Sequence, residues 1–129
     1  MGFIVTGLLL AGGCGKSDAA KAIEQYDPAE VQMLRDQGAA SGIEVTDEIL
    51  LSTLQARDDC RTIRAALDSM AAGRTDDEAM QKFKDLPADN RERGQVDQAS
   101  YFQTLVDSAL LGDPSIAKDY HDKNCADVK

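Results

Sequence analysis

A long apolar stripe between Thr46 and Ala72 constrains the fold of this chain more than any other feature. Read at steps of four and three residues, one face of the segment carries apolar or small side chains: Ile49, Thr53, Ala56, Cys60, Ile63, Leu67 and Met70. This is the spacing of one face of an α-helix, which would be about 36–40 Å long at about 1.5 Å per residue. Leu50 and Leu54 widen the face at its N-terminal end, and Gly73 is a typical stop. We therefore predict a long central helix over residues 46–72.

A seam of this kind could also pair with a second chain as a coiled coil. Thr53, Ala56 and Cys60 would make a weak zipper, because stable coiled coils place larger apolar side chains at such positions. We therefore favour a bundle formed within one chain, and the sequence leaves the oligomeric state open.

The segments on either side of the central helix carry helix signals of their own. Thr75 and Glu78 form a capping box that opens one of them. Pro87 is expected to end that helix, so that residues 89–94 become a charged connector. The predicted fold is all-α: a small bundle of about four to five helices around the central helix, in a single domain over residues 19–129. The helices expected beside the central one cover residues 17–26, 27–38, 75–86, 95–111 and 114 onward.

The N-terminal segment is apolar, then small, and ends at a cysteine. Its residues are Met-Gly-Phe-Ile-Val-Thr-Gly-Leu-Leu-Leu-Ala-Gly-Gly before Cys14, with no charge before Lys16. From about residue 3 to residue 14 this stretch resembles a bacterial lipoprotein signal peptide with its lipobox. Leu10 stands one position earlier than in the usual box, and no basic residue opens the segment. The resemblance implies that residues 1–13 are removed, that Cys14 carries lipid, and that residues 14–18 form a short tether.

Other interpretations of this segment are open. Residues 12–17 look like the end of a phosphate-binding loop, but that motif needs glycine where Leu10 stands. Gly2 with Thr6 fits the permissive pattern for N-myristoylation. The segment could also be a plain buried helix or strand of a cytosolic protein. A membrane span is excluded, because crossing a bilayer needs about 20 apolar residues.

Two cysteines, Cys60 and Cys125, remain after Cys14. If Cys14 is lipidated in an exported protein, the other two form an even pair suited to an oxidising compartment. Their bridge would close a loop of about 66 residues, for which the chain-entropy model gives about 4 kcal/mol of stabilisation. Their Cα atoms should then lie within about 7 Å of each other. The alternative is two unpaired core residues in a reducing compartment.

The chain has 23 acidic and 14 basic residues and a formal net charge of −9. Nucleic acid is disfavoured as a partner, because binding it needs a basic footprint. Anionic headgroups would also repel the protein, so the lipid on Cys14 should hold it at the bilayer. Acidic proteins suit basic partners, although the charge could serve only solubility.

No catalytic constellation emerges from the sequence. His121 is the single histidine, and no nucleophile or pocket is marked beside it. Acidic pairs such as Asp58-Asp59 and Asp76-Asp77 are explained by capping and solvation. Two cysteines and one distant histidine fall short of a metal site, and no cofactor is expected. Arg57, Arg61 and Arg64 share one stripe of the central helix, where they could grip a carboxylate or phosphate of a ligand or partner, or could form local salt bridges.

These observations favour a lipid-anchored protein of the cell envelope that acts by binding an envelope protein and not by catalysis. Proteins of this build serve as immunity or exclusion proteins or as adaptors of envelope complexes, an argument by analogy with a class. It would lie on the periplasmic side of the inner or outer membrane, or on the outer face of a Gram-positive membrane. The alternatives are a cytosolic nucleotide-binding protein that uses residues 12–17 and a small envelope hydrolase that uses His121 or a carboxylate pair.

Overall fold

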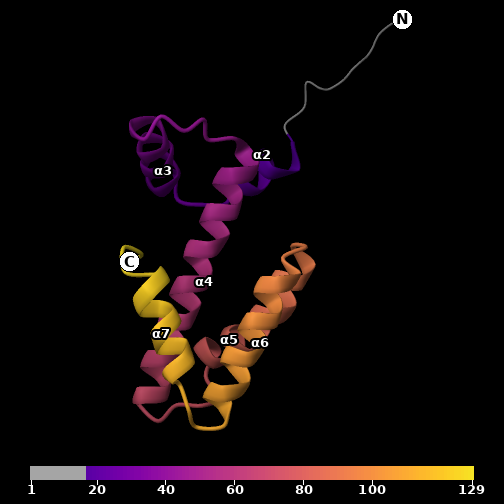
Figure 1. The fold of residues 1–129 in the computed structure, drawn as a ribbon, viewed down its shortest axis with the longest axis vertical. Helices are drawn as coiled ribbons and strands as arrows, with labels where there is room; N and C mark the ends of the chain where they lie inside the picture. The colour runs from indigo at the N-terminus through magenta and orange to yellow at the C-terminus, as the bar shows by residue number, and fades with distance from the viewer. Residues whose placement is uncertain (1–16) are drawn as a thin grey trace, which may run out of the picture. The chain divides into compact units, whose positions relative to one another are not determined.

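The described part of the chain is entirely helical. A computed structural model describes residues 17–129, which form six helices and no strand (Figure 1). The predicted all-α class is therefore confirmed, and each of the segments expected to be helical contains one of these helices. The helices are α2 (Asp18–Ile23), α3 (Pro28–Ala40), α4 (Asp47–Ala71), α5 (Glu78–Glu92), α6 (Val96–Leu110) and α7 (Ser115–Asn124).

The chain divides into two compact units, and the division falls within α4 between Ala56 and Arg57. Unit 1, described from residue 17, contains α2, α3 and the first ten residues of α4. Unit 2 contains the rest of α4 and helices α5, α6 and α7. At 25 residues, α4 is about 38 Å long, as its stripe predicts. The single domain over residues 19–129 stays a prediction.

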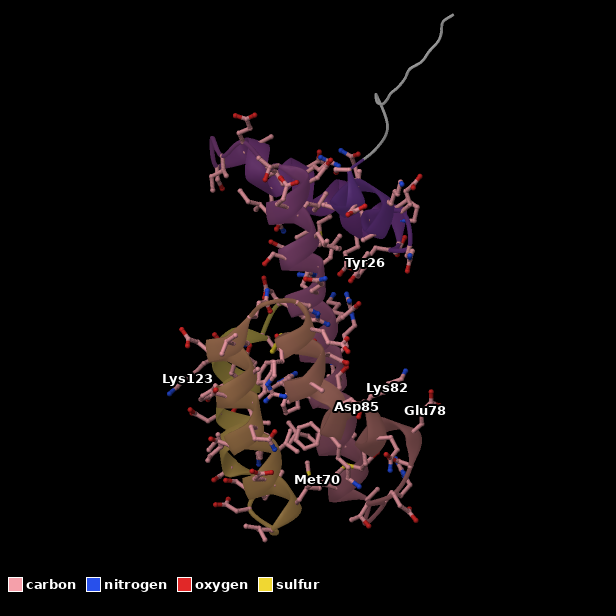
Figure 2. All side chains as sticks on the ribbon, turned by 90° about the vertical axis from the view of Figure 1, so that its right-hand side faces the viewer. Tyr26, Met70, Glu78, Lys82, Asp85 and Lys123 are labelled. Carbon is pink, nitrogen blue, oxygen red and sulfur yellow. A yellow bond between two sulfur atoms is a disulfide. The ribbon has the colours of Figure 1, made fainter. Side chains whose placement is uncertain are left out.

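The core of unit 1 is small and aliphatic. Half-buried side chains, including Tyr26 (labelled in Figure 2) and Val45, pack against it. No aromatic ring among the described residues of this unit is fully buried. Its buried side chains are Ile23, Leu34, Leu50 and Leu54.

The core of unit 2 is larger and contains aromatic rings. Helices α5 and α6 pack extensively against each other, and α6 packs against α7 (Figure 1). The ring of Tyr120 on α7 stands edge-on to Phe102 at 5.3 Å between centroids, a favourable aromatic geometry. The buried side chains of this core are Ile63, Ala66, Met80, Phe83, Leu86, Phe102, Leu105, Val106, Ala109 and Ala117.

The N-terminal half of α4 buries a different face from the one predicted. Leu50 and Leu54, expected only to widen the stripe, are fully buried, whereas Ile49 is 49% exposed and Ala56 is exposed. Further along, Cys60 and Ile63 are buried as predicted. In unit 1 the two leucines therefore define the core face of α4, which is shifted around the helix by about one residue from the predicted stripe.

The predicted end of α5 at Pro87 is wrong, because the helix continues to Glu92. Proline removes one helical N–H and clashes with the preceding turn, so tertiary contacts must hold such a helix together. Here Pro87 is buried, and the buried Asn90 one turn later donates from Nδ2 to the Leu86 carbonyl at 2.9 Å. The helix also begins later than predicted: Asp77, not Thr75, is the N-cap and accepts from the Met80 N–H.

Four helices end in the same glycine-based motif. At the end of α3, Gly42 has a φ of +74°, the Ile43 N–H bonds to the Gly38 carbonyl, and the Gly42 N–H bonds to the Ala39 carbonyl. This pair of bonds is the Schellman motif. Helix α3 therefore extends two residues beyond the Gly38 that the sequence predicts as its end. Gly73, Gly94 and Gly112 end α4, α5 and α6 with the same pair of bonds.

Candidate functional site

The Cys60–Cys125 disulfide is present, as the sequence predicts, with a Cα–Cα distance of 5.6 Å. Cys60 lies on α4 and Cys125 is the C-cap of α7. Both are buried, and Val128 and Tyr120 pack against them. The bridge therefore fastens the C-terminal segment to α4 within unit 2.

The predicted arginine stripe lies next to this bridge. Arg61 donates from Nη1 to Asp58 Oδ1 at 2.8 Å and from Nε to the main-chain oxygen of Lys129 at 2.8 Å. Its guanidinium therefore holds the last residue of the chain beside the bridge. Arg57 is half-buried and Arg64 is exposed. Ligand binding by these three arginines stays a prediction.

A buried polar cluster links α4 to the C-terminal end of α5. Asp59 Oδ2 accepts from Arg93 Nη1 at 3.0 Å and from Asn90 Nδ2 at 3.2 Å. The Asp59 side chain is 6% exposed and that of Arg93 is 23% exposed. Burial raises the pKa of the Asp59 carboxyl, although the Arg93 charge opposes this shift. Two pairing groups thus only partly offset the desolvation of this carboxylate.

Sequence reasoning missed this cluster, because it assigned Asp58-Asp59 to solvation and ended α5 before Asn90. One sequence clue was available: Asp59 directly precedes Cys60 on the core face of a helix. Asn90 Oδ1 is buried without a hydrogen-bond partner in the described part of the chain. The contacts of the cluster join α4 to the end of α5, so they contribute to the packing of unit 2.

Asp77 and Asp119 make structural contacts. Asp77 caps α5 and also accepts a hydrogen bond from Ser69 Oγ at 2.7 Å. The bond from Ser69 is the largest cause of the lowered pKa of the Asp77 carboxyl. Asp119 pairs with Lys123 on α7. His121 is half-buried in the last turn of the same helix. These contacts support the capping and solvation expected from sequence.

The surface of α5 shows the same solvated character. Glu78 and Lys82 pair at 3.6 Å, and both extend outward with Asp85 (Figure 2). All three residues are exposed. Charges one helical turn apart on an exposed face add only a few tenths of a kcal/mol.

An apolar groove of about 240 Å³ opens on the surface of unit 1. It forms where the end of α3, the segment 41–46 and the first turns of α4 meet. Gly38 makes this meeting possible, because a Cβ at that position would overlap the Val45 side chain. Two large apolar side chains on its rim are exposed, Ile43 at 57% and Ile49 at 49%. The lining residues are Leu34, Gln37, Gly38, Ser41, Ile43, Val45, Ile49, Leu50 and Thr53.

The charge of unit 1 is strongly one-sided. Residues 17–56 contain eight Asp and Glu against two Lys and Arg, a formal net charge of −6. Glu44 and Glu48 are exposed beside the two rim isoleucines, and Asp47 pairs with Arg35 at 3.5 Å. The groove is thus an apolar hollow set in an acidic surface. The sequence pattern hid it, because that pattern placed Ile49 in the core.

A second hollow, of about 300 Å³, lies in unit 2. Its lining includes Met70 (labelled in Figure 2), the buried Met80 and the exposed Leu110. Leu111, 88% exposed, follows Leu110 in the chain. The charge of unit 2 is less one-sided than that of unit 1, because residues 57–129 carry fifteen acidic and eleven basic side chains.

The N-terminal motifs lie mostly outside the described residues. This applies to the signal-peptide segment, to Cys14 and to Lys16 of the phosphate-loop alternative. Ser17, the last residue of that loop pattern, is the N-cap of α2 and accepts from the Ala20 N–H. The described residues provide no strand for the parallel sheet that such a loop requires.

Within residues 17–129 no group of three or more His, Cys, Asp or Glu side chains is arranged to hold a metal ion. None of the helices in this range combines the length and apolar character needed to cross a bilayer. No family model, curated protein or solved structure matches the chain. The function must therefore be inferred from the residues and their geometry.

Proposed function

We propose that the protein is a lipid-anchored protein of the cell envelope that acts by binding another envelope protein. The observation that carries the proposal is the Cys60–Cys125 disulfide. Persistent disulfides are typical of exported proteins. With those two cysteines paired, Cys14 is left alone at the end of an apolar segment, as a lipid-attachment cysteine would be.

In this proposal the lipid and the protein body have separate tasks. Acyl chains on Cys14 hold the protein at the bilayer, which a net charge of −9 would not favour by itself. The acidic body meets the partner, and opposite charge on that partner speeds the encounter. Within this class we favour an immunity or exclusion role over an adaptor role, because a small acidic protein suits the inhibition of a basic one.

Membrane fractionation of the full chain and its Cys14→Ser variant tests the anchor. The wild-type chain should sediment with membranes, and its mass should correspond to cleavage before Cys14 plus acyl groups. The Cys14→Ser chain should leave the membrane fraction. Recovery of an intact Met1–Lys129 mass from native membranes would contradict the proposal.

Lys16→Ala is the matched control, two residues from the lipid site. It should leave membrane partition unchanged, because the proposed anchor depends on Cys14. The same variant tests the nucleotide-binding alternative, in which Lys16 contacts phosphates. Binding of ATP by the wild-type chain that is lost in Lys16→Ala would favour that alternative instead.

A further inference from the structure

The groove of unit 1 is suited to side chains and not to a whole cofactor. Its volume of about 240 Å³ lies below the range of about 300–1,000 Å³ typical of small-molecule sites. The exposed parts of Ile43 and Ile49 extend its apolar surface beyond the hollow. A surface of this kind can bind one or two apolar side chains of an amphipathic segment, as hydrophobic grooves of binding proteins do.

The acidic surroundings decide which segment fits. Glu44 precedes Val45 in the loop, and Glu48 precedes Ile49 in the first turn of α4, so each exposed carboxylate adjoins a lining residue. A partner that inserts an apolar side chain would place its flanking residues near these carboxylates. Lys or Arg at the flanking positions would be attracted, and Asp or Glu would be repelled.

Other occupants fit less well. A second copy that docked by the same surface would bring two units of net charge −6 together. Anionic headgroups would meet the same repulsion. The apolar residues 1–13 of the chain itself contain no Lys or Arg, so they would not use the acidic rim.

We infer that this groove is the docking surface for the partner, and that the partner presents a cationic amphipathic segment with an apolar side chain between Lys or Arg residues. The inference rests on the proposed function as a binding protein and specifies where binding occurs. Unit 2 does not share the strongly one-sided charge of unit 1, because residues 57–129 carry fifteen acidic and eleven basic side chains.

A synthetic amphipathic helix tests the inference. The probe is an 18-residue peptide with leucines on one face and lysines on the other, added to the ¹⁵N-labelled full chain in nonionic detergent. Amide shifts should concentrate in residues 34–53. A peptide with glutamates in place of the lysines should not bind. Shifts spread over α5, α6 and α7, or equal binding of both peptides, would overturn the inference.

Paired variants distinguish binding at the groove from nonspecific apolar contact and from nonspecific attraction to acidic side chains. Ile49→Ser should weaken lysine-peptide binding about tenfold, whereas Val96→Ser, at a similarly exposed isolated position on α6, should change it less than about twofold. Glu44→Lys with Glu48→Lys should also weaken binding about tenfold, against less than about twofold for Asp122→Lys with Asp127→Lys. Equal effects of the paired variants would contradict a specific groove.

Failure of this inference is distinct from failure of the proposed function. If the peptide binds elsewhere while Cys14→Ser abolishes membrane partition, only the docking surface is wrong. If Cys14→Ser leaves membrane partition unchanged, the anchored function is wrong whatever the peptide shows.

Discussion

The two units of the molecule bury very different cores. Unit 2 combines fully buried Phe83 and Phe102, a disulfide and a buried ion pair. The described part of unit 1 has four buried aliphatic side chains, and its one aromatic residue, Tyr26, is half-buried. Since buried apolar area is the main stabilising term, we expect unit 2 to be the more stable part.

The distribution of charge also indicates that unit 1 is the less stable of the two units. The net charge of −6 in residues 17–56 is concentrated in a smaller segment than the −4 of residues 57–129. Concentrated like charge opposes compaction. Unit 1 thus buries fewer apolar side chains than unit 2 and has stronger repulsion between its own acidic residues. A cationic partner would reduce this repulsion. The region with the weaker core is therefore also the one best suited to binding, as is common for parts of low local stability.

Removal of the disulfide should have the largest effect. The double variant Cys60→Ser/Cys125→Ser removes a covalent link between residues 65 positions apart in the chain. We expect the free energy of unfolding of unit 2 to fall by about 4 kcal/mol. Hydrogen exchange of the full chain should then speed up in α5, α6 and α7 more than in α2 and α3.

Cys60→Ala/Cys125→Ala separates the loss of the covalent link from the burial of two hydroxyl groups and should give a similar or slightly smaller loss. An equal acceleration of exchange in both units would break the comparison, because it would mean that they unfold as one cooperative body.

Loss of Arg93 should have the next largest effect, and this effect depends on pH. Arg93→Ala leaves the buried Asp59 carboxylate without its charged partner, and we expect a loss of about 3 kcal/mol at neutral pH. Burial already raises the folded-state pKa of Asp59, and the variant raises it further. A raised carboxyl pKa disfavours the folded state at pH above that pKa, and the penalty is relieved as pH falls toward the unfolded pKa of about 3.9.

Denaturant unfolding at pH 7 and at about pH 4.5 checks this prediction. The loss caused by Arg93→Ala should shrink at the lower pH. Arg91→Ala, at an exposed position in the last turn of α5, should cost less than about 0.5 kcal/mol at both pH values. A loss that does not change with pH would show that Arg93 contributes packing and not charge.

The sequence predicted the helical class and the disulfide because both depend on strong local or countable features. The apolar stripe predicted the helix α4, Gly73 predicted its end, and the even pair of cysteines predicted the disulfide. The continuation of α5 through Pro87 was not predictable in this way. It depends on the burial of Pro87 and on the bond from Asn90 to Leu86 within the packed unit, and tertiary packing of this kind overrides local propensity.

The groove was missed for a similar reason. Ile49 and Leu50 are both large and apolar, and helical spacing alone does not decide which of two neighbours faces the core. The close approach of Val45 to Gly38 brings the loop onto α3, and the fully buried Leu50 packs in the same cluster while Ile49 stays half-exposed. No pattern within α4 contains this information.

Gly38→Ala should destabilise unit 1 by up to about 2 kcal/mol. Alanine gains about 1 kcal/mol over glycine inside a helix, but its Cβ would overlap the Val45 side chain. Valine is stiff about χ1, so the overlap should cost about 1–3 kcal/mol and outweigh the gain. Hydrogen exchange of α3 amides in the full chain measures the change.

The double variant Gly38→Ala/Val45→Ala is the control for this overlap. Removing the Val45 methyl groups should relieve the clash, so that alanine at residue 38 becomes neutral or favourable in that background. An unchanged penalty would place its cause in the Schellman bonds at the end of α3.

Ile49→Ser should have the smallest effect on stability, below about 0.5 kcal/mol, because the Ile49 side chain is already half-exposed. Leu50→Ala, one residue later and fully buried, should cost about 3 kcal/mol. Thermal unfolding of the two variants therefore measures which face of α4 is buried in unit 1. If Ile49→Ser proved as costly as Leu50→Ala, the face predicted from the stripe would be the buried one, and Ile49 would be unavailable at the groove. A small effect instead makes Ile49→Ser a variant that changes the docking surface without weakening the unit that carries it.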